Sequence, residues 1–122
     1  MPVALSPQAL SYLKAVHAYD APAFVSLFEP EAVVDDAGRL IHGSAAIREW
    51  FERDVVAASV TLTPVAEVDD GGQAVLTALV DGTFDRTGLP NPLLITHRIQ
   101  TGAGGKFARL TCRLLQERNP AA

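Results

Sequence analysis

The chain has one cysteine, Cys112, no long hydrophobic run and no excess of positive charge. A single cysteine excludes an intrachain disulfide and any zinc site that needs several cysteines. No apolar run approaches the roughly 18 residues of a membrane helix, so we expect neither a membrane span nor a signal peptide. Ten basic against 14 acidic residues argue against nucleic acid or an anionic membrane as the main partner. We therefore expect a cytoplasmic protein.

The composition is that of an ordinary globular domain. The chain has 122 residues, of which 48% are apolar. A chain of this size buries roughly two-thirds of its unfolded surface, so a core can form without a metal or a disulfide. No repeat or linker interrupts it, and we expect one domain over residues 1–122.

Three helices are predicted in the first half of the chain. The first covers residues 7–19, begins at an N-cap on Ser6, and turns Tyr12 inward by its helical spacing. The second covers residues 21–28. The third has Ser44 as its expected N-cap. Its apolar stripe consists of Ile47, Trp50 and Phe51.

The other patterned segments indicate strands joined by turns. A short hairpin is predicted between the second and third helices, and four strands follow the third helix. Their ranges are 32–36, 39–42, 60–68, 73–84, 93–100 and 106–116. Helices followed by an antiparallel meander predict an α+β domain, with the helices packed on one face of a curved sheet.

Strand alternation sorts the candidate residues by face. Ile95 and His97 share one face of their strand. On the last strand Leu110, Cys112 and Leu114 face inward, and Arg109, Thr111 and Arg113 face outward. Asp35 and Asp36 point to opposite faces, and we expect Asp35 to be solvated.

The order of elements resembles the nuclear transport factor 2-like superfamily, which includes ketosteroid isomerases and SnoaL-like polyketide cyclases. The stretches AVVDD at 32–36 and GSAAIREWF at 43–51 are similar to the ketosteroid isomerase segment that carries the catalytic base and the following helix. This resemblance implies a cone-shaped domain, with three N-terminal helices on a strongly curved mixed or antiparallel sheet that encloses an apolar pocket.

The resemblance also implies roles for individual residues. Asp36 takes the position of the general base, and Tyr12 that of the hydroxyl that hydrogen-bonds the developing enolate oxygen. In the family a protonated aspartic acid is the second hydrogen-bond donor to this oxygen. Ile95 takes its position here, and an isoleucine side chain cannot donate a hydrogen bond. The implied pocket walls are Phe28, Trp50, Phe51, Leu110, Cys112 and Leu114.

Each of these residues also has a structural interpretation. Asp36-Ala37-Gly38 is a typical turn sequence, in which an aspartate binds its own backbone. Tyr12 on an inward helical face is typical of a core tyrosine. His97 is either a core histidine or, with Asp36, the titrating pair of a dehydratase or cyclase. No His, Asp or Cys spacing indicates a metal site, and we expect no cofactor.

The favoured function is that of a ketosteroid isomerase-like or SnoaL-like enzyme. It would act by proton transfer on a small apolar carbonyl compound, as an isomerase, cyclase or dehydratase. We expect a small lipophilic ligand and a homodimer formed through the outer sheet face. The alternative is a non-catalytic ligand-binding or dimerisation module on the same fold. An epoxide hydrolase of this superfamily would need two carboxylates bracketing an arginine, and Arg98 faces away from Asp36.

Overall fold

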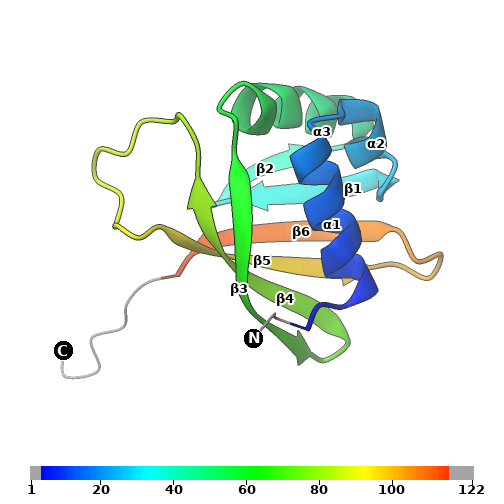
Figure 1. The fold of residues 1–122 in the computed structure, drawn as a ribbon. Helices are drawn as coiled ribbons and strands as arrows, with labels where there is room; N and C mark the ends of the chain where they lie inside the picture. The colour runs from blue at the N-terminus through cyan, green and yellow to red at the C-terminus, as the bar shows by residue number, and fades with distance from the viewer. Residues whose placement is uncertain (1–3, 116–122) are drawn as a thin grey trace.

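The computed structural model describes residues 4–115 and confirms the α+β class. Its helices are α1 (Pro7–Ala18), α2 (Ala21–Val25) and α3 (Ser44–Phe51), and a π-helical turn, η1 (Glu52–Val56), prolongs α3. Figure 1 shows α1 lying across the sheet near α2 and α3. The strands are β1 (Phe28–Asp36), β2 (Arg39–His42), β3 (Thr61–Asp70), β4 (Gln73–Asp81), β5 (Leu94–Thr101) and β6 (Phe107–Leu114).

The strands form one mixed sheet in the order β2-β1-β6-β5-β4-β3. β1 and β6 run parallel, and every other neighbouring pair is antiparallel. The register pairs Asp36 with Cys112 and Cys112 with His97. These three residues therefore form a row across three adjacent strands. Because neighbouring strands lie about 4.8 Å apart, about 10 Å separates the backbones of Asp36 and His97.

Two helix predictions need correction. The second helix ends at Val25 rather than near residue 28. Phe28 instead begins β1, because the strand ladder takes over at this point and the Phe107 N–H donates to the Leu27 carbonyl. The third helix is capped by Gly43, with φ +90°, and the Ser44 side chain is not the N-cap. By contrast, Ser6 caps α1 as predicted, accepting a hydrogen bond from the Ala9 N–H.

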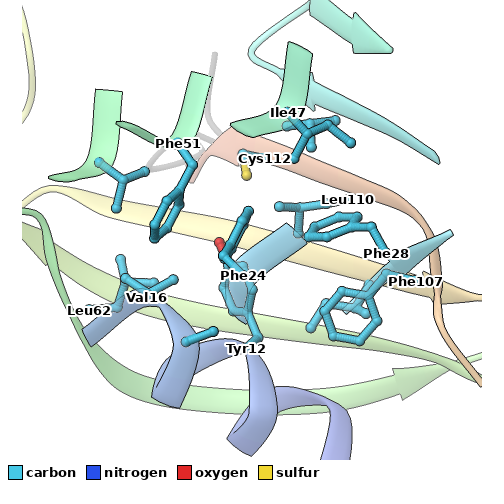
Figure 2. Packing of buried hydrophobic residues seen from close by; sticks show 14 of the residues in the cluster. Tyr12, Val16, Phe24, Phe28, Ile47, Phe51, Leu62, Phe107, Leu110 and Cys112 are labelled. Carbon is cyan, nitrogen blue, oxygen red and sulfur yellow. The ribbon is translucent and has the colours of Figure 1, made fainter. Parts of the chain in front are cut away.

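The core is an aromatic cluster centred on Phe24 of α2, which is fully buried. Its ring stacks on Phe51 at 4.1 Å between centroids and lies 5.1 Å from Phe28. The Tyr12 ring (Figure 2) and the Trp50 ring each lie 6.2 Å from the Phe24 ring, between centroids. This cluster fixes α1, α2 and α3 over the inner face of the sheet.

The expectation that Asp35 is solvated is wrong. Asp35 does face away from Asp36, but it is only 4% exposed, because two arginines of β6 cover it. Arg113 donates to both carboxylate oxygens at 2.9 Å, and Arg109 donates at 3.0 Å. These bonds, Arg113's foremost, hold the pKa of Asp35 well below its usual range. The Gly38 N–H also donates to Asp35, so Asp35 closes the hairpin turn.

No helix within residues 4–115 is long and apolar enough to cross a membrane. The same residues contain no cluster of three metal-ligating side chains.

Candidate functional site

A cavity of about 420 Å³ lies between α1, the α3–η1 segment, the inner face of the sheet and the loop after β4. Its wall is mainly apolar, and the exceptions are a few hydroxyl, carboxylate, imidazole and guanidinium groups. The lining residues are Tyr12, Val16, Asp36, Ala37, Trp50, Asp54, Val55, Val60, Leu62, Val80, Phe84, Leu89, Leu93, Ile95, His97, Cys112, Arg113 and Leu114.

Most of the candidate residues line this cavity, and three do not. Tyr12, Asp36, Trp50, Ile95, His97, Cys112 and Leu114 are at its wall. Phe28, Phe51 and Leu110, which the resemblance implies as pocket walls, are buried and are not among the residues that line this cavity. Leu110 faces inward like Cys112, but Figure 2 shows it beside the Phe28 ring. Alternation therefore predicts the correct face of β6, and the aromatic rings decide which part of that face stays open.

Asp36 is held at the cavity wall by one of its two carboxylate oxygens. Its Oδ2 accepts a hydrogen bond from Trp50 Nε1 at 3.0 Å and another from Arg39 at 3.0 Å. No group within residues 4–115 donates to Oδ1. Because Asp35 makes the bond that closes the turn, the Asp36 side chain is free to face the cavity. The carboxylate is thus fixed in place while one oxygen remains available.

The second polar part of the cavity wall consists of three buried side chains, Tyr12, His97 and Cys112. The Tyr12 hydroxyl lies 2.8 Å from His97 Nδ1, and Cys112 Sγ lies 3.6 Å from the same nitrogen. Tyr12, His97 and Cys112 are each less than 10% exposed. In the described part of the chain, His97 Nε2 has no hydrogen-bond partner.

Burial keeps these three groups uncharged near neutral pH. It raises the pKa of Tyr12 well above its ordinary value and lowers the pKa of His97 to about 4. It also raises the pKa of the Cys112 thiol to about 12, with a smaller contribution from the Asp36 charge. Cys112 is therefore not a thiolate nucleophile. Tyr12 and His97 act as neutral hydrogen-bonding groups.

Two carboxylates bracket an arginine at the edge of the cavity. Arg39 donates to Asp36 at 3.0 Å and to Asp54 at 2.5 Å, and both acids line the cavity. Sequence reasoning missed this group because Arg39 lies on β2 and Asp54 lies in the π-helical turn, so no sequence spacing joins them. Arg98 pairs with Asp70 and not with Asp36, as its strand face predicted.

The loop between β4 and β5 supplies part of the wall that the sequence analysis missed. Phe84, Leu89 and Leu93 of this segment line the cavity. The available signal was the presence of large apolar residues in a stretch otherwise rich in glycine and proline. Leu89 is 38% exposed, which places it where a ligand could cover it.

Residues 9–110 match the SnoaL-like domain. A candidate polyketide cyclase from Sinorhizobium meliloti is 30% identical, with 89% of this chain and 95% of that chain covered and a TM-score of 0.78. No curated protein matches the sequence.

Two more distant structures share the fold. SalBIII, an epoxide hydrolase/cyclase-like enzyme of pyran ring formation in the polyether salinomycin, is 22% identical, with 89% and 88% of the two chains covered and a TM-score of 0.72. A protein of ketosteroid isomerase-like fold from Catenulispora acidiphila, in complex with trimethylamine, is 19% identical, with 90% and 86% covered and a TM-score of 0.74. The match over residues 9–110 and the 30% identity to the Sinorhizobium protein show that this chain belongs to the SnoaL-like domain family.

Proposed function

We propose that this protein binds a small, mainly apolar carbonyl compound in the cavity and moves a proton on it. The observation that carries the proposal is the Asp36 carboxylate, which has one oxygen anchored and the other free at the wall of an apolar cavity. His97 lies in the same row of the sheet, one strand beyond Cys112. A ligand over Cys112 would therefore lie between a carboxylate and a neutral hydrogen-bonding pair.

The proposed reaction follows from these positions. Asp36 Oδ1 takes a proton from the carbon next to the carbonyl group, and negative charge moves to the carbonyl oxygen. The Tyr12–His97 pair stabilises that oxygen by hydrogen bonding, in a site from which the apolar wall keeps most water. Return of the proton to another carbon gives an isomerase. Loss of a hydroxyl group, which leaves as water with the proton that Asp36 took up, gives a dehydratase. Attack of the enolate carbon on a second carbonyl carbon, whose oxygen takes that proton, gives a cyclase.

The apolar wall also predicts the ligand class. Cavities of this kind bind lipophilic molecules and orient them with a few polar groups. We expect a polycyclic phenol or a steroid-like ketone to raise the unfolding temperature, and sugars and nucleotides to leave it unchanged. Differential scanning fluorimetry measures this, with Leu89→Lys as a variant whose charge should weaken the apolar ligands. A nucleotide that stabilised the protein more than any apolar ligand would contradict the proposal.

The Asp36–Arg39–Asp54 group supports a second candidate function, epoxide opening. One carboxylate would take a proton from water as the water attacks an epoxide carbon, and the protonated other carboxylate would give its proton to the epoxide oxygen. Asp54→Asn should then reduce diol formation from cyclohexene oxide at least about 100-fold. Under the proton-transfer proposal, the same variant should leave turnover of a ketone nearly unchanged. Gas chromatography measures the diol, and a separate assay on the same protein preparation measures turnover of the ketone. Together the two measurements distinguish the two candidate functions.

We also propose a homodimer formed through the outer face of the sheet. In the described part of the chain, no helix lies over that face of β4, β5 and β6 (Figure 1). It presents half-buried or exposed side chains, among them Val75, Leu79, Thr96 and Thr111. Homo-oligomers most often have two-fold symmetry. Light scattering should give twice the mass of the chain at micromolar concentration, and the mass of a monomer there would refute the dimer.

A further inference from the structure

His97 carries an unpaired polar atom at a place where burial makes that costly. Its side chain is 4% exposed, and within residues 4–115 Nε2 is the buried side-chain nitrogen or oxygen atom that lacks a hydrogen-bond partner. A buried donor or acceptor without a partner loses its hydration and gains nothing in exchange. Because His97 lines the cavity, we infer that the partner of this atom arrives with a bound molecule.

The contact with Tyr12 decides which nitrogen of His97 carries the proton. A neutral imidazole has one donor nitrogen and one acceptor nitrogen. If Nδ1 accepts from the Tyr12 hydroxyl at 2.8 Å, the tyrosine proton is satisfied and only Nε2–H is unpaired. If Nδ1 donates instead, the Nε2 lone pair is unpaired and the Tyr12 proton is left with the Cys112 sulfur, which is a weak acceptor. The first arrangement leaves fewer groups unsatisfied, so Nε2 is the protonated nitrogen.

The surroundings of His97 restrict what can pair with Nε2–H. The register places Leu76 and Cys112 beside His97 on the two neighbouring strands, and neither side chain provides a strong acceptor. Since no described residue bonds Nε2, the partner that we expect is an acceptor atom of the bound molecule.

We propose that His97 Nε2–H is the donor that binds the carbonyl oxygen of the ligand, and that Tyr12 is a positioning residue that fixes the histidine tautomer. This inference rests on the proposed function only in taking the ligand to be a carbonyl compound. It departs from the role implied by the family resemblance, in which the tyrosine itself touches the oxygen. The low pKa of His97 agrees with a neutral donor, which suits a ketone.

A pair of ligands of nearly the same shape tests the contact without any use of turnover. 1-Tetralone has a carbonyl group, and tetralin is the same bicyclic skeleton without it. The native protein should bind the ketone about tenfold more tightly in an NMR titration, because tetralin leaves Nε2–H unpaired. The infrared carbonyl band of bound 1-tetralone should also move to lower frequency. Equal affinities with no band shift would overturn the proposal.

Two substitutions of similar size separate the nitrogens of His97. In His97→Gln the amide reaches the position of Nε2 and can still donate, so the preference for the ketone and the band shift should persist. In His97→Asn the amide reaches only the position of Nδ1, and both should be lost. If His97→Asn keeps them and Tyr12→Phe abolishes them, Tyr12 is the donor and the proposal is wrong.

The tautomer can be measured in the ligand-free native protein, so the test remains even if a variant fails to fold. Nitrogen-15 NMR should show His97 Nδ1 unprotonated and Nε2 protonated, and Tyr12→Phe should give a mixture of the two tautomers. A protonated Nδ1 in the native protein would overturn the proposal. Asp36→Asn should leave the tautomer and the ketone preference unchanged, so a failure of catalysis and a failure of this inference give different results.

Discussion

Replacing Asp36 by asparagine is expected to lower turnover of a 5-en-3-one ketone by a factor of about 10²–10⁴. The amide can still accept the hydrogen bond from Trp50, so the fold and the cavity should persist. It cannot take up the proton that Oδ1 is proposed to receive. Steady-state turnover of the native and variant proteins under identical conditions measures the effect.

The matched control is Asp69→Asn. Asp69 also lies beside a hairpin turn and accepts a backbone hydrogen bond, from the Gly72 N–H, but it is not among the cavity-lining residues. This variant should keep full activity. If Asp36→Asn keeps the activity as well, the non-catalytic ligand-binding module becomes the better description.

A gain of activity is expected from Ile95→Asp in the same assay. Ile95 lines the cavity two residues before His97, where the resemblance implies a protonated aspartic acid. A further hydrogen-bond donor to the carbonyl oxygen should raise turnover by a factor of about 10²–10³. The apolar wall should keep the new carboxyl group protonated, at a cost of about 1–3 kcal/mol in the free energy of unfolding. A folded variant without a gain would indicate that the cavity serves different chemistry.

The largest loss of stability is expected from Phe51→Ala. Phe51 is fully buried and stacks on Phe24 at 4.1 Å, so removing its ring deletes apolar burial and leaves a void at the centre of the aromatic cluster. Substitutions of this type lower the free energy of unfolding by about 3–5 kcal/mol. Urea unfolding monitored by circular dichroism measures the change, with an unchanged m value as the sign of two-state behaviour.

Leu89→Ala is the comparison for Phe51→Ala. Leu89 lines the cavity and is 38% exposed, so its loss should change the free energy of unfolding by less than about 0.5 kcal/mol. If Phe51→Ala cost as little, its ring would be a cavity wall, as the family resemblance implied, and not part of the packed core.

The sequence by itself determined the fold class and the face on which most candidate residues lie. Helical spacing placed Tyr12 inward, and strand alternation placed His97 beside Ile95 and turned Asp36 away from Asp35. These periodicities are properties of the isolated helix and strand, so they can be read without knowing what packs against them. The long match to one family then predicted the arrangement of helices and sheet.

Only the tertiary structure decided how deeply each side chain is buried and which residues it bonds. Cys112 and Leu110 share one face of β6 and both belong to the buried core, yet Cys112 lines the cavity and Leu110 does not. Asp35 is buried because arginines of β6, more than 70 residues further along the chain, cover it. The bond between Tyr12 and His97 spans 85 residues. Local sequence encodes the direction of a side chain, but its burial and its partners depend on which distant segments the fold brings against it.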